Sequence, residues 1–290
     1  MRLKADLTLL VVAILWGSAF AAQRVAAQLH SVYFFNGARF LLAALILLPF
    51  TLKIRASGRQ WLWMSATGSI LFVASALQQA GLVTTSAGNA GFITSMYVVL
   101  VPFVIWIGWG ERPSWIAIVA VALAAFCAYL LSTGGSFAPQ FGDVLEAVAA
   151  LFWAMHVIIV GKYAPRFNPV SFSAGQLLVG GVLNVAVSAV AERPILPLPS
   201  SLVQAIVYTA VASLGLGYTL QIWGQRHTPP TDAAIILSLE SVFAVSAGWL
   251  LLHEGLSAVQ ALGCLLILGA VLLGQVRRWG RIATLEAGGP

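Results

Sequence analysis

Long apolar segments recur along this 290-residue chain and are separated by short polar stretches. Each is close to the roughly 20 residues that an α-helix needs to cross the hydrocarbon core of a bilayer. We expect ten membrane-spanning helices, at about Asp6–Ala22, Tyr33–Leu52, Trp61–Ala80, Ser86–Trp109, Trp115–Leu131, Asp143–Tyr163, Pro169–Ala191, Leu202–Gly224, Thr231–Leu252 and Ala258–Val276. The chain is therefore predicted to be an all-α integral membrane protein with ten transmembrane helices.

The charge content agrees with a membrane protein. Only 8% of the residues are charged and the mean hydropathy is +0.94, which leaves too little polar surface to cover a soluble globule. The pI of about 9.7 could suggest a nucleic-acid partner, but the Lys and Arg residues lie between the apolar segments rather than in one patch. We therefore expect the lipid bilayer as a partner and no nucleic acid.

Two stretches of the chain are near copies, Thr94–Pro113 and Ser238–Gly255. The pairs related by a shift of 143 residues are Glu111 with Glu254, Pro102 with Val245, Tyr97 with Glu240, Asn89 with Asp232, and Gln78 with Gln221. Earlier in each half the shift is 137 residues, and it pairs Trp16 with Trp153 and Arg39 with Gln176. A nearly constant shift over so many positions indicates an internal duplication, with an insertion near Glu192–Pro199.

The duplication divides the chain into two five-helix repeats. We predict the first repeat at 1–133, a connecting loop at 134–142, the second repeat at 143–277, and a tail at 278–290. Because five is an odd number of crossings, the second repeat enters the membrane from the opposite side. Two inverted repeats around a central cavity suit a carrier that opens its cavity first to one side and then to the other.

The positive-inside rule orients the chain. With the N terminus in the cytoplasm, twelve Lys and Arg residues of the loops and termini fall inside, and only Arg24 and Arg193 fall outside. Both termini are therefore expected in the cytoplasm.

Several motifs resemble a known family. They are WGSAF at Trp16–Phe20, the spacing from Pro102 to Glu111, and SLES followed by LLHEGLSAVQALGCLLILGAVLL near the C terminus. In this order they resemble the drug/metabolite transporter superfamily, EamA type, over nearly the whole chain. The resemblance implies a core of helices one to four and six to nine, with helices five and ten peripheral.

Within that superfamily the chain looks most like the YddG-type amino-acid exporters of bacterial inner membranes. The family's helix-nine motif commonly reads Leu-Glu-Pro, whereas Ser241 stands in place of the proline here. This weakens the expectation of a kink in helix nine and leaves the expected fold unchanged.

Glu240 is the first candidate for the cavity, because an acidic residue inside an apolar span usually marks a functional site. In one interpretation it binds a substrate amine or carries a coupled proton. In the other it is a structural carboxyl group, hydrogen-bonded between helices. The sequence alone does not distinguish between these two roles of Glu240.

His156 follows Trp153 by about one helical turn, so the two share a face. A histidine can carry a proton at physiological pH, but hydrogen bonding to a backbone carbonyl is the simpler expectation. Arg39 either binds a carboxylate or, as we favour, pairs internally. The full set of predicted substrate-binding residues is Trp16, Gln78, Asn89, Tyr97, Trp153, His156, Tyr218, Gln221 and Glu240.

These residues also have structural interpretations. The neutral polar ones could join helices, and aromatic residues near span ends could be interfacial anchors instead of cavity walls.

Enzyme motifs are absent from the sequence: we find no HExxH, GxSxG or Walker A pattern. We expect no cofactor and no metal site. The predicted function is export of small metabolites, preferably aromatic and neutral amino acids, by a secondary, alternating-access carrier of the bacterial inner membrane. Sugars, nucleotide-linked compounds or toxic amphiphilic drugs are the alternative substrates, and a membrane enzyme or assembly subunit is the alternative class. The alanines Ala120, Ala124 and Ala128 form a small-residue ridge that could pack against a neighbouring helix, and we expect a monomer or a weak homodimer.

Overall fold

The computed structural model describes residues 1–29, 31–113, 140–193 and 197–255, with isolated residues 115, 118, 119, 122, 258, 261, 262 and 265. Regular secondary structure in these residues is helical throughout. The elements are α1 (Arg2–Gln28), α2 (Tyr33–Leu47), η1 (Leu48–Phe50), α3 (Gly58–Gly81), α4 (Ala87–Ser95), α5 (Tyr97–Trp109), α7 (Phe141–Tyr163), η2 (Ala164–Arg166), α8 (Pro169–Ala191), α9 (Ser200–Tyr208), η3 (Thr209–Leu216), α10 (Gly217–Gly224), α11 (Pro230–Leu237) and α12 (Glu240–Leu252).

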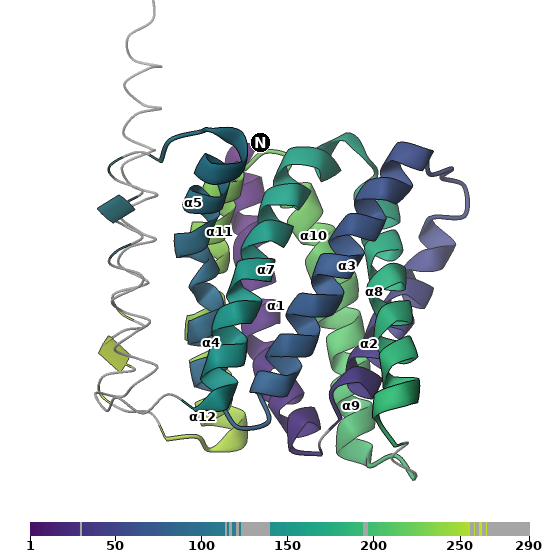
Figure 1. Ribbon diagram of the computed structural model, residues 1–290, viewed down its shortest axis with the longest axis vertical. Helices are drawn as coiled ribbons and strands as arrows, with labels where there is room; N and C mark the ends of the chain where they lie inside the picture. Colours follow the sequence, from purple (N-terminus) through teal and green to yellow (C-terminus); the bar gives the residue numbers. More distant parts are fainter. Residues whose placement is uncertain are drawn as a thin grey trace, which may run out of the picture.

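Seven helical segments in the described residues are long and apolar enough to cross a membrane. The α3 helix runs through the bundle beside them (Figure 1), but it is less apolar because it carries buried polar residues such as Gln60, Gln78 and Gln79. The prediction of an all-helical membrane protein is thus confirmed for the described residues, whereas the arrangement of ten helices as two repeats stays a prediction. The expected spans Trp115–Leu131 and Ala258–Val276, the alanine ridge, most of the connecting loop and the tail lie outside the described residues.

The predicted helices four and nine are each interrupted. The first breaks at Met96, between α4 and α5, and the second at 238–239, between α11 and α12. Met96 and Leu239 are related by the 143-residue shift, and at both the backbone N–H bonds three residues back instead of four. Three serine hydroxyls donate to the carbonyl three residues earlier, those of Ser95, Ser238 and Ser241, which bends helices.

This corrects the expectation drawn from the missing proline. The interruption of helix nine occurs without a proline, and Pro102 lies inside α5, beyond the interruption of helix four. Within the predicted helix eight, a π-helical segment, η3, joins α9 to α10.

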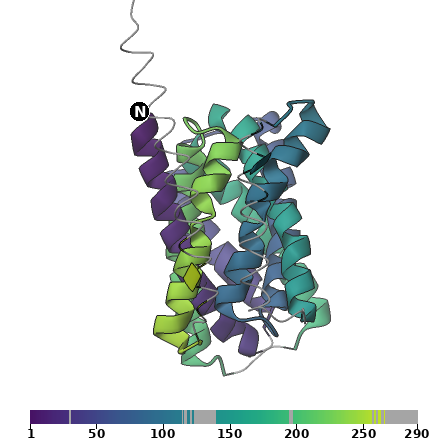
Figure 2. The ribbon, with the colours of Figure 1, turned by 90° about the vertical axis from the view of Figure 1, so that its left-hand side faces the viewer.

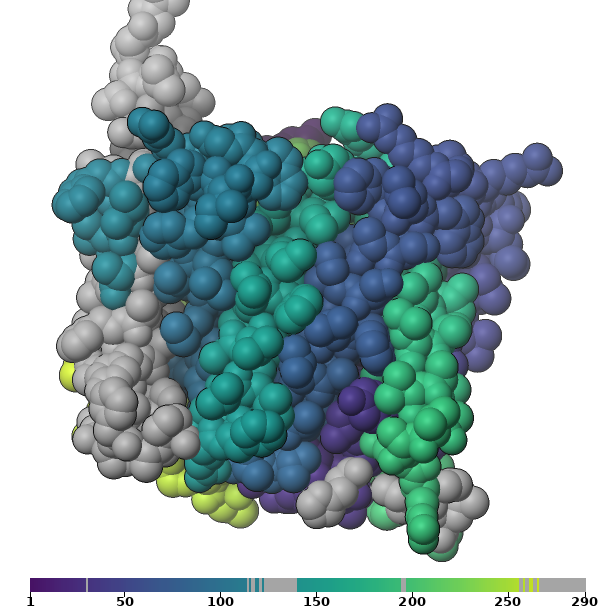
Figure 3. All heavy atoms as spheres, in the orientation of Figure 1, coloured from purple at the N-terminus to yellow at the C-terminus, as the bar shows by residue number. Residues whose placement is uncertain are grey.

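Helices from the two predicted repeats pack against each other across the bundle. The α1 helix packs on α12, α10 and α11, the α2 helix on α8, and the α3 helix on α7 and α8. Figure 2 shows α1 beside the helices of the C-terminal half, and Figure 3 shows α7, α3 and α8 side by side on one face. Each wall of the interior is therefore built from both repeats.

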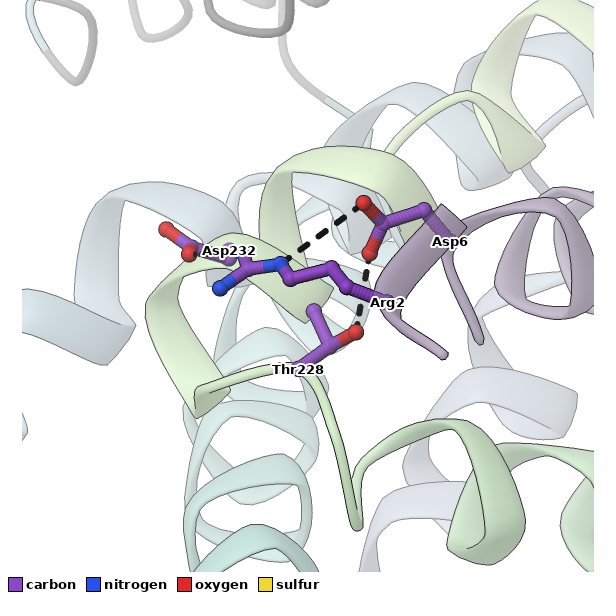
Figure 4. A network of polar contacts seen from close by, with 4 residues as sticks. All are labelled: Arg2, Asp6, Thr228 and Asp232. Atoms are coloured by element: carbon purple, nitrogen blue, oxygen red, sulfur yellow. Dashed lines mark hydrogen bonds and ion pairs between the residues drawn. The ribbon is translucent and has the colours of Figure 1, made fainter. Parts of the chain in front are cut away.

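One end of the bundle gathers the basic residues. At the end where α1 and α3 begin and α5 and α7 end (the top of Figure 1), the described Lys and Arg residues are Arg2, Lys4, Lys53, Arg55, Arg59, Arg112, Lys162, Arg166 and Arg226. Figure 4 shows part of this end: Arg2 forms ion pairs with Asp232 at 2.5 Å and Asp6 at 3.7 Å, and the Thr228 hydroxyl donates to Asp6 at 2.8 Å. These contacts tie the start of α1 to the α10–α11 connection.

Candidate functional site

A cavity of about 40 Å³ lies inside the bundle. This volume is far below the roughly 300–1,000 Å³ of typical small-molecule pockets. The lining residues are Trp16, Phe20, Gln23, Arg39, Phe40, Gln78, Thr94, Tyr97, Trp153, His156, Val157, Ser213, Leu214, Tyr218 and Glu240. Seven of the nine residues that the sequence nominated are among them.

Glu240 and Tyr97 reach the cavity from equivalent positions. Each is the first residue of the half-helix that follows an interruption, Glu240 in α12 and Tyr97 in α5. Their side chains face each other, and both residues are almost fully buried. Because a helix N-terminus carries partial positive charge, the interruption at 238–239 provides a favourable electrostatic position for the Glu240 carboxylate.

Glu240 retains capacity for a ligand. Its Oε1 atom has no hydrogen-bond partner among the described residues. A buried polar atom without a partner is energetically costly, by about 1–3 kcal/mol. A donor group on a substrate, such as an ammonium, would remove that cost.

Aromatic rings form one wall of the cavity. Tyr218 lies 5.2 Å from Trp16 and 5.4 Å from His156, measured between ring centroids, and Trp153 stands edge-on to His156 at 6.3 Å. The Trp16 indole donates to the Ser213 carbonyl at 2.9 Å. This carbonyl belongs to the π-helical segment η3, a conformation often found at functional sites.

Gly217 makes room for this arrangement. A β-carbon there would come within 2.6 Å of the Trp16 indole nitrogen. The Trp16 ring can therefore reach Ser213 only beside a glycine.

His156 is fully buried, and its Nε2 atom pairs with the side-chain oxygen of Gln176 at 3.0 Å. The expected partner, a backbone carbonyl, is therefore wrong, and the actual partner is an amide side chain from α8. Gln176 is the residue that the 137-residue shift pairs with Arg39.

Arg39 lies at the cavity wall and is 3% exposed. Its Nε and Nη2 atoms donate to the Asn36 side-chain oxygen at 3.0 and 2.7 Å. The guanidinium also lies over the rings of Phe35 and Phe40, at 4.8 and 5.6 Å. Arg39 therefore pairs internally, as favoured from the sequence, but with neutral groups only, so its positive charge remains available to an anion.

Tyr218 lines the same cavity as Arg39 and Glu240 and is close enough to both to interact with their charges. The cavity thus combines a carboxylate, a guanidinium and aromatic rings. This combination can bind a zwitterion with an apolar or aromatic substituent.

A second buried carboxylate, Glu146, was missed by the sequence analysis. It is fully buried on α7, where the Thr94 hydroxyl donates to its Oε2 atom at 2.9 Å, and Gln78 donates to Thr94 at 3.0 Å. Glu146 lies only three residues beyond the expected start of its span and so resembled a surface residue. Its spacing of seven residues from Trp153, two helical turns on the same face, was the available signal.

Two nominated residues do not line the cavity. Asn89 lies in the first turn of α4, where its backbone N–H bonds to Ser86. Gln221 is fully buried on α10, and neither of its amide atoms has a hydrogen-bond partner among the described residues. No cluster of three or more potential metal ligands occurs in the part of the chain that the structure describes.

Comparison with known sequences links the chain to transporters. The sequence model of the EamA-like transporter family matches residues 3–133 and 140–274. An uncharacterized transporter from Archaeoglobus fulgidus is 34% identical over 278 residues, which cover 95% of this chain and 87% of the relative. An S-adenosylmethionine/S-adenosylhomocysteine transporter from Chlamydia muridarum is 26% identical over 282 residues, covering 90% of this chain and 87% of the relative.

A solved structure shares the fold. A crystal structure of a protein superposes with a TM-score of 0.75 at 18% sequence identity, and the match covers 96% of this chain and 99% of that one. At this identity the likeness concerns the fold alone.

Proposed function

Because the chain belongs to the EamA-like transporter family, and is thus a membrane transporter, we propose that it is a secondary carrier of small zwitterionic metabolites. The family assignment confirms the resemblance to the drug/metabolite transporter superfamily found in the sequence. The substrate class, the mechanism and the direction of transport are the proposal.

The observation that carries the proposal is the pair of opposite charges at one cavity. Glu240, with an oxygen that lacks a partner, is suited to a substrate ammonium, and Arg39, which pairs only with neutral groups, to a substrate carboxylate. The aromatic wall at Trp16, Trp153 and Tyr218 suits an apolar or aromatic substituent. An α-amino acid has these three features.

The alternative substrates fit this cavity less well. Phosphate-bearing compounds would need several cationic side chains, and among the described residues Arg39 is the one Lys or Arg that lines this cavity. Sugars would leave both charged groups without a counter-charge. The relative from Chlamydia muridarum is named for S-adenosylmethionine and S-adenosylhomocysteine, which both carry an α-amino and an α-carboxyl group, so larger amino-acid derivatives join the candidate substrates.

Alternating access is proposed for the mechanism. The cavity is too small for a metabolite and lies between helices of both predicted repeats, as expected of a carrier between its two open states. The gradient of the substrate or of an ion would drive transport. The basic end of the bundle would face the cytoplasm of a bacterial inner membrane, and transport would proceed outward.

The test is flux of labelled aromatic and small neutral amino acids in proteoliposomes, for the parent protein and Glu240→Gln. A matched control is Glu111→Gln, because Glu111 is 62% exposed and distant from the cavity lining. We expect saturable flux that falls at least about tenfold in Glu240→Gln, for the loss of one charged hydrogen bond, and is unchanged in Glu111→Gln. The same assay with and without a pH gradient identifies the driving gradient.

Three results would contradict the proposal. If the folded protein transported no amino acid or amino-acid derivative, the proposed substrate class would be wrong. Full flux in Glu240→Gln would show that the Glu240 carboxylate does not bind the substrate ammonium. Activity on a substrate without its movement across the membrane would favour a membrane enzyme instead.

A further inference from the structure

A groove outside the central cavity lies between α2, η1, α3 and α8, at the basic end of the bundle. These helices neighbour one another at the right of Figure 1. The volume of the groove is about 560 Å³, compared with about 40 Å³ for the central cavity. It is therefore the larger of these two spaces in the described structure.

The walls of the groove are apolar. Leu41, Ala44, Leu45 and Leu48 line one side, Trp61 and Met64 another, and Ala174, Gly175 and Leu178 the third. The two hydroxyl groups at the walls already have partners: Thr51 donates to the Leu48 carbonyl at 2.8 Å, and Ser171 accepts from the Gln60 amide at 3.1 Å. These walls therefore suit a hydrocarbon rather than a polar ligand.

The groove opens toward the hydrocarbon of the bilayer at the level of the interface. Leu45, Trp61 and Leu178 on its rim are 64%, 44% and 42% exposed. Trp61 lies in the first turn of α3, and tryptophan at a span end usually lies at headgroup level. A hydrocarbon chain in the groove would thus be attached to a headgroup near the beginning of α3.

Three cationic side chains stand at that level. Lys53, Arg55 and Arg59 lie in and just after the loop that joins η1 to α3, and all are exposed. The neighbouring groove residues Ile54 and Ala56 belong to the same loop. No acidic residue occurs between Thr51 and Arg59, and none of the three cations forms an ion pair within the described residues.

We propose that this groove is a binding site for an anionic phospholipid, with an acyl chain between α2, α3 and α8 and the phosphate at Lys53, Arg55 and Arg59. Basic pockets between transmembrane helices bind such headgroups. Because α2 and α3 belong to the first predicted repeat and α8 to the second, the lipid joins the two repeats at one end of the bundle. The site does not depend on which metabolite the central cavity carries.

The test is a titration of the full-length protein in mild detergent with phosphatidylglycerol or phosphatidylcholine, read by native mass spectrometry. We expect a first phosphatidylglycerol to bind more tightly than phosphatidylcholine. Replacing all three cations, as K53Q/R55Q/R59Q, should weaken phosphatidylglycerol binding on the order of 100-fold, from roughly 1 kcal/mol for each cation, and leave phosphatidylcholine binding unchanged.

The acyl-chain part of the site is tested separately. Ala174→Trp places a large side chain in the groove and should weaken the binding of both lipids at least about tenfold, because it displaces the acyl chain. The matched control is Val182→Trp on the same helix, where Val182 is 52% exposed and outside the groove lining, and lipid binding should not change. Glycerol phosphate, which has no acyl chain, should not compete.

Several outcomes would overturn the proposal. Equal affinity of the parent protein for the two lipids, or unchanged phosphatidylglycerol binding in K53Q/R55Q/R59Q, would exclude the phosphate site. Unchanged binding in Ala174→Trp would exclude the groove, and competition by glycerol phosphate would point to a free anion site instead. A dimer of the chain that forms without lipid and is lost in Ala174→Trp would assign the groove to a second copy.

Discussion

Glu254 and Glu111, which the 143-residue shift pairs, act at opposite ends of the bundle in different ways. Glu254, after α12, accepts hydrogen bonds from the backbone N–H groups of Ala87 and Gly88 at 2.9 and 3.2 Å, at the start of α4. Glu111, after α5, forms an ion pair with Lys162 at 2.5 Å. The first is half-buried, whereas the second has a side chain that is 62% exposed.

The physical difference lies in the partner. A carboxylate at a helix N-terminus gains from two charge-assisted hydrogen bonds and from the helix dipole. An exposed ion pair is screened by water and contributes about 0–1 kcal/mol. The α4 end of the bundle is thus held more firmly by this residue than the opposite end is by its counterpart.

The second predicted repeat does not provide Glu111 with the partner that Glu254 has. The residues of α11 that correspond to Ala87 and Gly88 are Pro230 and Thr231, and proline has no backbone N–H. The start of α11 is instead held through the ion pair of Asp232 with Arg2 (Figure 4). Single residue differences at the starts of α4 and α11 therefore account for the different contacts at the two ends of the bundle.

Removing the Glu254 carboxylate should have the largest effect. Glu254→Ala leaves two N–H groups at the start of α4 without their acceptor, and we expect a loss of about 2–3 kcal/mol in the free energy of unfolding. The measurement is denaturant unfolding of the purified protein in detergent. Glu111→Ala is the matched control and should lose less than about 1 kcal/mol. Equal losses in the two variants would refute the inequality of the ends.

The packing around Glu254 gives the next largest effect. A β-carbon at Gly248 would collide with the Glu254 carboxylate, whereas one at Gly108 would meet nothing within 4 Å. Gly248→Ala should therefore cost about 1–3 kcal/mol, as overpacking does. Gly108→Ala should be neutral or should stabilise by about 0.5 kcal/mol, because alanine favours a helix. If Gly248→Ala proved as harmless as Gly108→Ala, the Glu254 contact would be loosely packed.

Some of the features around Glu111 and Glu254 could be predicted from the sequence, and others could not. The apolar spans located the helical segments that the structure describes, because hydrophobic length is a local property, and the 143-residue shift paired Glu111 with Glu254. The sequence could not show that Glu254 bonds to the start of α4, since that contact joins residues 166 and 167 positions apart. It also misjudged helix nine, because a serine that bonds to its own backbone gives a weaker signal than a proline.

The residues of the cavity could likewise be predicted only in part from the sequence. Glu240, Trp16 and Trp153 could be nominated because charged or aromatic residues stand out in apolar segments, and all three line one cavity. Glu146 was missed because its position near a span end resembled a surface position. Gln221 was nominated as a neutral polar residue of an inner helix, but residue type alone does not say which side of a helix faces the cavity.

A third test concerns the residues before the two glutamates. Gly110 and His253 are also paired by the shift, and both have positive φ, 74° and 53°. A left-handed conformation costs a residue with a β-carbon about 1 kcal/mol or more. Gly110→Ala should therefore destabilise by about 1 kcal/mol, and His253→Gly should stabilise by about 0.5–1 kcal/mol, measured by the same unfolding assay. Destabilisation in His253→Gly would mean that the imidazole itself holds this turn.

The smallest effect should come from the exposed pair. Glu111→Gln removes its charge while keeping its shape, and we expect a loss of about 0.5 kcal/mol at low salt that disappears at high salt. Lys162→Gln should lose slightly more and keep part of the loss at high salt, because the Lys162 ammonium also lies 4.9 Å from the centre of the Trp109 ring. The measurement is the unfolding free energy of both single variants and the double variant at two salt concentrations. A coupling energy above about 1.5 kcal/mol, insensitive to salt, would show that this end is held as firmly as the end at Glu254.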